Sequence, residues 1–366
     1  MHERRAKVLP LKIAPGRRIL VISDIHGNLP YFDALLKKAG FCGEDELILD
    51  GDFLEKGPDS LGTLRRIMEL NKAGNVHALC GNCDNWGEIF LPDWTEEADR
   101  HVLRYLAWRK SGLLWDMCRS LGIDPLGIED FGPVKRRLRD AFPAEWAFLS
   151  ALPYAIETEN FLFAHAGAEP EKPLSEHTEA EFCRVESLLT TGRRFDKWLV
   201  VGHWPVMLYG ENIVCANPII DRDKHIISID GGCVLKDDGQ LNALVIPDMG
   251  SEDFDFIAYD PFPERRVLND QAEGERSYYI RWGDSRVRVL HRGEEFARCR
   301  HVRTGYEMDI LTKYLFTGEE ITNCNDCTDY VLPLKAGDTV RVVEECSRGY
   351  FVKHRGVSGW YYGGLE

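Results

Sequence analysis

The sequence contains no apolar run that approaches the roughly 20 residues a helix needs to cross a bilayer. Its first 18 residues are basic and lack the apolar core of a signal peptide. Positive charge is scarce in the chain as a whole, because 45 lysines and arginines stand against 60 acidic residues. The net charge of -15 repels a phosphate backbone, so we expect neither a membrane nor a nucleic acid as partner.

Regular cysteine pairing is also missing. The 11 cysteines are odd in number and scattered in spacing, which argues against a disulfide framework and for free thiols. Together with the missing signal peptide, this predicts a reducing, cytoplasmic location. At 366 residues the chain is longer than one ordinary domain, and we expect two or three folded units.

What the sequence does contain is a series of polar loops that follow apolar segments. The segments are typical of buried strands and lie at residues 18–22, 46–49 and 76–80. Helical patterns at residues 31–39 and 60–71 connect them, which predicts parallel β-loop-α-β units. The carboxyl ends of such strands share one edge of the sheet, where open α/β sheets bind ligands.

The loops at this edge carry side chains that can bind metals. Asp24 and His26 follow the first segment, Asp52 follows the second, and Asn82 follows the third. Carboxylate, amide and imidazole groups bind divalent ions such as Mn, Fe or Zn. One Asp-x-His pair would be a weak signal, but three loops in register predict a metal site.

Two later histidines follow strands in the same way. His165 comes after an apolar segment at residues 160–164, and His203 comes after one at residues 197–201. A single histidine of this kind is more often a surface or core residue than a ligand. Two of them, downstream of the acid-bearing loops, make a shared site the better interpretation.

Two other regions complete the expected catalytic unit. From residue 86 to about 157 the pattern is mostly helical, with apolar residues at three- and four-residue spacing in 98–110 and 134–151. This insertion could be extra core or could help to choose the substrate. Strands at residues 225–230 and 241–247 are expected to form a hairpin in a second sheet against the first.

In chain order, the motifs Asp-x-His-Gly, Gly-Asp-x-x-x-Lys-Gly-Pro, Gly-Asn-x-Asp, His-x-Gly and Gly-His resemble the calcineurin-like metallophosphoesterases. The runs at residues 229–233 (IDGGC) and 240–244 (QLNAL) are similar to the phosphoprotein phosphatase branch, which also contains the diadenosine tetraphosphatases. The resemblance covers roughly residues 17–248. It implies a four-layer α/β/β/α sandwich that holds two metals.

The resemblance also implies a role for each ligand. Asp24 and His26 would hold the first metal, Asp52 would bridge both, and Asn82, His165 and His203 would hold the second. Two divalent ions about 3.5 to 4 Å apart would then activate a shared water, so that a metal-bound hydroxide attacks the phosphorus. Among Mn, Fe and Zn, we favour Mn.

Two positions depart from the family pattern. Lys56 stands where the family has an arginine that forks onto the phosphate, so the charge remains while the bidentate geometry is lost. Lys56 and Asn82 are the expected substrate-binding residues. Cys83 stands where the family has a histidine that protonates the leaving oxygen, and Asp84 loses the imidazole it would orient. Cys83 and Asp84 are the candidate catalytic residues, with Cys83 the poorer proton donor.

This change bears on the leaving group. A serine or threonine alkoxide is strongly basic and needs a proton, whereas a phenolate or a phosphate from an anhydride needs much less help. We therefore expect a preference for aryl phosphates or phosphoanhydrides over alkyl phosphoesters.

The composition changes after residue 250. Residues 1–250 are the expected metallophosphoesterase domain, residues 251–317 a linker with short strands and a helix within 301–315, and residues 318–366 a small all-β domain. The last segment has short strands with glycine turns and resembles an SH3-like barrel. Such a domain could bind a protein partner or pack within the molecule.

The leading functional hypothesis is a metal-dependent protein phosphatase of the serine/threonine or tyrosine type, acting on a phosphorylated protein or a small phosphate ester. The alternative enzyme is a dinucleoside polyphosphate hydrolase of the diadenosine tetraphosphatase kind, which the run at residues 57–61 (GPDSL) also resembles. A third hypothesis, from another class, is a catalytically weak scaffold that acts through its SH3-like domain. Retention of all six candidate ligands argues against the scaffold.

Overall fold

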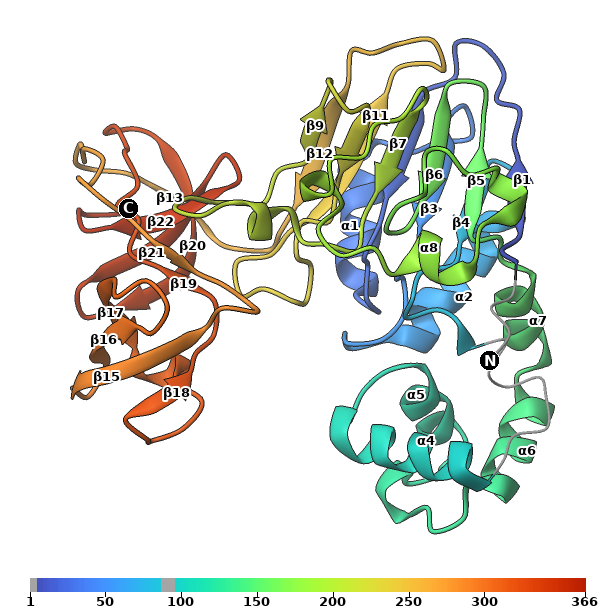
Figure 1. The fold of residues 1–366 in the computed structure, drawn as a ribbon, viewed down its shortest axis with the longest axis horizontal. Coiled ribbons are helices and arrows are strands. Elements are labelled where there is room, and N and C mark those ends of the chain that lie inside the picture. Colours follow the sequence, from blue (N-terminus) through green and yellow to red (C-terminus); the bar gives the residue numbers. More distant parts are fainter. Residues whose placement is uncertain (1–4, 87–95) are drawn as a thin grey trace. The chain divides into compact units, whose positions relative to one another are not determined.

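The computed structural model describes residues 5–86 and 96–366 (Figure 1). The chain divides into two compact units. The first contains Met1–Trp204, Pro218–Leu235 and Gly239–Asp260, and the second contains Pro205–Asn217, Lys236–Asp238 and Pro261–Glu366. None of the helices in the described residues combines the length and the apolar character that a bilayer crossing requires.

The first unit combines helices with strands. Its strands are β1 (Val8–Pro10), β2 (Ile19–Ile22), β3 (Glu46–Asp50), β4 (Val76–Leu79), β5 (Ala155–Glu157), β6 (Phe161–Ala164), β7 (Trp198–Val201), β9 (Ile219–Asp221), β10 (Ile226–Ser228), β11 (Leu241–Ile246) and β12 (Asp255–Tyr259). Its α-helices are α1 (Leu29–Ala39), α2 (Ser60–Asn71), α4 (Glu96–Arg109), α5 (Leu113–Ser120), α6 (Phe131–Ala141), α7 (Pro143–Ala151) and α8 (Glu179–Cys183). Short 3-10 helices lie at Pro125–Gly127, Leu174–Glu176 and Leu188–Thr190.

One five-stranded sheet carries the first three loops. Its order is β12-β11-β2-β3-β4, and β2, β3 and β4 are parallel neighbours, as the sequence predicts. Every residue of β2 is buried, which is typical of a parallel strand covered on both faces. The loops after these strands therefore leave the sheet at the same edge.

A six-stranded sheet carries the two later histidines. Its order is β1-β5-β6-β7-β10-β9. Within it, β6 is parallel to β7, and β7 is parallel to β10. The predicted hairpin of residues 225–230 and 241–247 is wrong, because β10 belongs to this sheet while β11 pairs with β2 in the other. The two strands have similar apolar patterns. The local sequence therefore does not indicate which of the two sheets each strand joins.

The two sheets pack face to face. Ile19 and Val21 of β2 share one buried cluster with Phe163 of β6 and Val200 of β7. Successive side chains of a strand point to opposite faces, so the neighbours of Ile19 and Val21 pack on the other side, against α1 and α2. These contacts establish a mixed α/β fold with several sheets, and the four-layer description as such is not confirmed.

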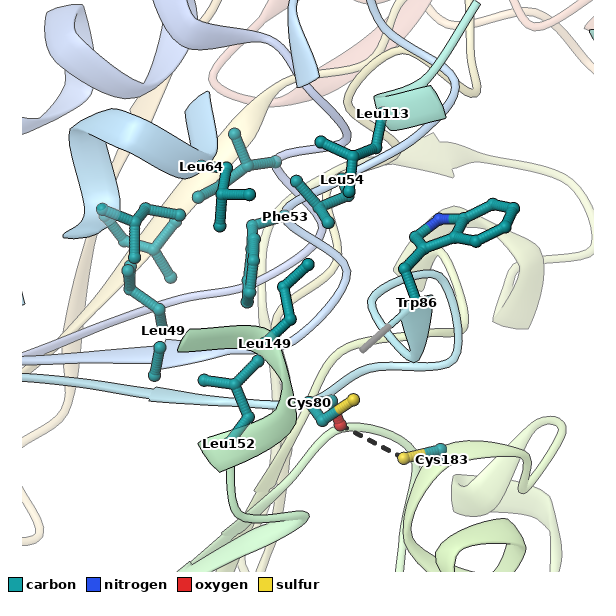
Figure 2. Close-up of a cluster of buried hydrophobic side chains, with 14 of the residues drawn as sticks. Leu49, Phe53, Leu54, Leu64, Cys80, Trp86, Leu113, Leu149, Leu152 and Cys183 are labelled. Carbon is teal, nitrogen blue, oxygen red and sulfur yellow. Dashed lines mark hydrogen bonds between the residues drawn. The ribbon is translucent and has the colours of Figure 1, made fainter. Parts of the chain in front are cut away.

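The region from α4 to α7 is helical in its described residues, as expected, while residues 87–95 of the predicted insertion lie outside the described residues. Figure 2 shows Leu113 beside Leu54, and Leu149 and Leu152 on the other side of Phe53. Asp116 of α5 accepts hydrogen bonds from the amides of Ser60 and Leu61 at the start of α2. An acidic group stabilises a helix N-terminus, so the insertion is fixed to α2 and to the second loop.

The second unit is built from strands. They are β8 (Val214–Cys215), β13 (Glu264–Arg266), β14 (Tyr279–Ile280), β15 (Arg286–Arg292), β16 (Phe296–His301), β17 (Glu307–Leu311), β18 (Ile321–Asn323), β19 (Cys327–Thr328), β20 (Thr339–Cys346), β21 (Gly349–His354) and β22 (Val357–Tyr361). Short 3-10 helices lie at Val206–Tyr209 and Thr312–Tyr314. The sheets run β13-β20-β21-β22-β8, β17-β16-β15-β18 and β14-β19.

The helix predicted within residues 301–315 is wrong. This segment contains β17, which pairs with β16, and then a short 3-10 turn. Met308 and Ile310 are both buried and two residues apart, which is the period of a strand that buries one face. The sheet of the last segment also includes β13 and β8 from outside residues 318–366, and an SH3-like barrel is not confirmed. The predicted domain boundaries stay a prediction.

We expect Leu113→Ala to lower the free energy of unfolding by about 2–5 kcal/mol. The reason is that this side chain of the insertion is fully buried and lies beside Leu54 of the second loop (Figure 2). Urea unfolding followed by circular dichroism measures this change. Leu126→Ala is the matched control, since Leu126 is 55% exposed and its truncation should cost less than about 0.5 kcal/mol. Equal losses in the two variants would contradict the described packing.

Candidate metal centre

The loops after β2 and β3 are joined through their backbones. The amide of Asp24 donates to the carbonyl of Gly51 (3.0 Å), and the amide of His26 donates to the carbonyl of Asp52 (2.9 Å). Asp24, His26 and Asp52 have φ angles of 55°, 51° and 50°. Residues other than glycine rarely adopt this left-handed region, and strained residues of this kind cluster at functional sites.

Asp52 lies at the centre of the cluster and is almost fully buried. Its Oδ1 accepts a hydrogen bond from the Cys83 amide (2.7 Å) and lies 3.3 Å from His165 Nε2. Burial by itself would raise the pKa of Asp52, but the charge of His165 outweighs it and holds that pKa well below its ordinary value. Asp52 therefore stays ionised and available as a ligand.

The six-stranded sheet contributes His165 and His203. His165 Nδ1 lies 2.9 Å from the carbonyl of Asp50, an acceptor that fixes the proton on Nδ1 and leaves Nε2 directed at Asp52. The amide of His203 donates to Asp24 Oδ2 (2.9 Å), and its ring centroid is 5.1 Å from that of His165. Residues from both sheets therefore meet in one cluster.

The charge states of the histidines suit a cation. Burial lowers the pKa of His26 and of His203 to about 3, with help from the charges of Lys56 and His165 respectively. A neutral imidazole is the form that binds a metal. Burial also acts to lower the pKa of His165, but the charges of Asp52 and Asp24 raise it to about 10. These carboxylates thus strongly favour a positive charge near His165 Nε2.

Two groups of side chains have ligand atoms within 4.8 Å of one another. They are Asp24, Asp52 and His165, and His26, Asp52 and Cys83. Among the described residues, the buried atoms without a hydrogen-bond partner include Asp24 Oδ1, Asn82 Oδ1 and His165 Nε2. Buried polar atoms normally have a partner, and a divalent ion would provide one. The donor set present therefore fits the binding of divalent ions, with Asp52 common to both groups.

Lys56 and Asp84 take clear positions around this cluster. Lys56 Nζ lies 3.1 Å from His26 Nε2 and 3.9 Å from Asp52 Oδ2. Asp84 is fully buried, and its two oxygens accept from the amides of Leu54 (3.1 Å) and Gly81 (2.9 Å). Burial, aided by the charge of Asp52, raises the pKa of Asp84 to about 8. Asp84 thus holds two loops together, a role that the sequence did not indicate.

Glu55 and Asp230 are buried acids that sequence reasoning missed. Glu55 accepts from the indole Nε1 of Trp86 (2.8 Å), from the amide of Leu113 (2.9 Å) and from the hydroxyl of Tyr105. Glu55 directly precedes Lys56, so these hydrogen bonds connect the helical insertion to the loop that carries Lys56. Asp230 accepts from the amide of Gly232 (2.8 Å), and burial raises its pKa to about 6. The available signal was an acid within an apolar stretch or directly after a strand.

A sequence profile of the calcineurin-like phosphoesterases matches residues 17–221, which is more than half of the chain. The chain belongs to this family. The matched range includes the loops of all six predicted ligands. The family implies divalent metal ions, and the cluster around Asp52 supplies candidate ligands. The specific role of each of the six residues stays a prediction.

The curated relatives described next are both named as bis(5'-nucleosyl)-tetraphosphatases. A symmetrical bis(5'-nucleosyl)-tetraphosphatase of Buchnera aphidicola is 30% identical over 148 residues, 39% of this chain and 52% of that protein. An asymmetrical bis(5'-nucleosyl)-tetraphosphatase of Oceanobacillus iheyensis is 22% identical over 247 residues, 59% of this chain and 84% of that protein. The match thus spans about half the length of the Buchnera relative.

A serine/threonine phosphatase structure from Saccharomyces cerevisiae also overlaps with this chain. It is 11% identical, with a TM-score of 0.44, over 71% of this chain and 85% of that one. An overlap of that quality supports no argument about fold or activity.

We expect Gly81→Ala to weaken Mn²⁺ binding at least about tenfold, because perturbing the support of a ligand has effects of this size. A Cβ at this position would lie 2.2 Å from Asp52 Oδ1, so the carboxylate would have to move. Calorimetric titration with Mn²⁺ measures the affinity. Gly43→Ala is the control, since a Cβ there has no atom within 4 Å. Unchanged affinity in folded Gly81→Ala protein would remove Asp52 from the metal site.

Proposed function

We propose that this chain is a divalent-metal-dependent phosphoesterase that hydrolyses the phosphoanhydride chain of dinucleoside polyphosphates. The observation that carries the proposal is the buried cluster around Asp52, in which ligand atoms from both sheets lie within 4.8 Å of one another. The names of the curated relatives favour this substrate class over phosphoproteins. Neither of the two curated relatives described above has the name of a protein phosphatase.

In this proposal the six predicted ligands hold two divalent ions. They are Asp24, His26, Asp52, Asn82, His165 and His203. Bound ions of this kind neutralise phosphate oxygens and activate a water for in-line attack. The protein supplies an ionised carboxylate shared by both ligand groups, the neutral imidazoles of His26 and His203, and a strained backbone that fixes the positions of the loops.

Lys56 is the proposed phosphate-binding residue. Its ammonium lies beside His26 and Asp52, and its side chain is 23% exposed, so it can reach a bound anion. A lysine offers a point charge where an arginine would offer two parallel hydrogen bonds. We therefore expect Lys56 to bind a single phosphate group more weakly than an arginine would. The several charges of the polyphosphate chain should compensate for this loss of affinity.

The identity of residue 83 supports an anhydride substrate. Burial raises the pKa of the Cys83 thiol well above its ordinary value, so the thiol is a weak acid. A nucleotide phosphate leaves without protonation, whereas an alkoxide does not. The reaction with an anhydride thus needs no proton donor at this position.

Metal-loaded protein is expected to hydrolyse diadenosine tetraphosphate, and removal of the ions by a chelator should abolish the activity. Asp52→Asn should lower kcat/KM at least about 100-fold, which corresponds to about 2.7 kcal/mol of transition-state stabilisation. Chromatography of the nucleotides measures the rate and distinguishes two ADP from ATP plus AMP. Hydrolysis of phosphopeptides without any cleavage of the dinucleotide would favour the protein phosphatase instead, and inactivity of the metal-loaded protein on both would favour the scaffold.

Leaving-group dependence gives a separate test. Phosphotyrosine peptide should be hydrolysed roughly 100-fold faster than phosphoserine peptide of the same sequence, the typical contribution of general acid catalysis. Initial rates of phosphate release measure the ratio. Cys83→His should narrow the difference by restoring a proton donor. A wild-type ratio near one would mean that another residue protonates the leaving group.

A further inference from the structure

Cys83 belongs to one of the two groups with metal-ligand geometry. Its Sγ lies within 4.8 Å of ligand atoms of His26 and Asp52. The backbone amide of Cys83 donates to Asp52 Oδ1 (2.7 Å), and the Asn82 amide group donates to Sγ (3.3 Å). The sulfur therefore has a hydrogen-bond partner and lies close to the carboxylate of Asp52.

A second observation points to a cation at this corner. Asp24 is 1% exposed, and its Oδ1 has no hydrogen-bond partner among the described residues. That atom lies 3.6 Å from His26 Nε2. His26 belongs to the ligand group of Cys83, whereas Asp24 belongs to the other group. An imidazole nitrogen, a carboxylate oxygen and a sulfur thus converge in the group of Cys83, and the Asp24 oxygen without a partner lies next to its imidazole.

We propose that Cys83 binds one of the divalent ions through its sulfur, so that this corner prefers zinc, ferrous iron or cobalt over manganese. Thiolate and imidazole ligands select these ions, whereas manganese prefers oxygen ligands. On binding, the S–H bond breaks, a sulfur–metal bond forms and the proton passes to solvent without any change of oxidation state. The inference rests on the metal centre of the proposed function, but not on its substrate.

Lys56 is compatible with this assignment. Its ammonium is 3.1 Å from His26 Nε2 and would repel an ion bound there. The four-carbon stem is flexible and the side chain is partly exposed, so the ammonium can move outward. The thiolate adds a negative charge that offsets the remaining repulsion.

Cobalt loading of the full chain tests the proposal. Co²⁺-loaded wild-type protein should show the near-ultraviolet band of thiolate-to-cobalt charge transfer, and Cys83→Ser should lose it. Cys42→Ser is the matched control and should keep the band, because Cys42 is an exposed thiol outside both ligand groups. Cys83→Ser should also weaken Zn²⁺ binding at least about tenfold while leaving Mn²⁺ affinity unchanged.

X-ray absorption at the zinc edge needs no variant and covers the case in which Cys83→Ser fails to fold. Zinc-loaded wild-type protein should show a sulfur neighbour at about 2.3 Å. Only oxygen and nitrogen neighbours, a charge-transfer band that survives Cys83→Ser, or failure to bind Co²⁺ and Zn²⁺ would overturn the proposal. A sulfur ligand in protein that does not cleave dinucleotides would leave this inference standing and refute the proposed function, and cleavage without a sulfur ligand would do the reverse.

Discussion

The buried, ionised carboxylate of Asp52 is the constraint around which the catalytic unit is built. A charge removed from water is costly unless partners surround it, and an unpaired one would destabilise the fold by several kcal/mol. Here a backbone amide, an imidazole and an ammonium from three different loops approach the same carboxylate. Those loops can converge only because their strands end at neighbouring positions in two sheets that pack face to face.

The convergence has a cost in backbone strain that surrounding contacts offset. Asp24, His26, Asp52 and His203 all adopt positive φ angles. Such conformations persist only where the structure around them determines them fully. Asp84 contributes to this by accepting two loop amides. Glu55 of the second loop contributes by accepting the amide of Leu113 in the helical insertion. The insertion therefore adds buried core and supports the loops of the metal centre. Of the two roles that its sequence left open, extra core and substrate selection, the structure describes the first.

Residue 83 connects the chemistry of the metals to that of the substrate. A histidine there would act on the leaving group, whereas a cysteine with its sulfur beside His26 and Asp52 is placed to act on a metal. Under the two proposals made above, a cysteine at this position would remove a proton donor and add a soft ligand. Of these two consequences, the missing proton donor is the one that favours the leaving group assumed in the proposed function, because a nucleotide phosphate needs no proton.

The sequence by itself determined the parallel strands β2, β3 and β4, the loops after them, and the candidate ligands, because apolar runs and the residues that end them are local features. Tertiary structure alone decided that β10 and β11 join different sheets, that residues 307–311 form a strand, and that β8 and β13 complete a sheet with β20, β21 and β22. It also decided that Glu55 and Asp84 bind loop and insertion amides and that Cys83 lies beside His26. Each of these facts depends on which distant segments become neighbours, and periodicity along the chain carries no record of that choice.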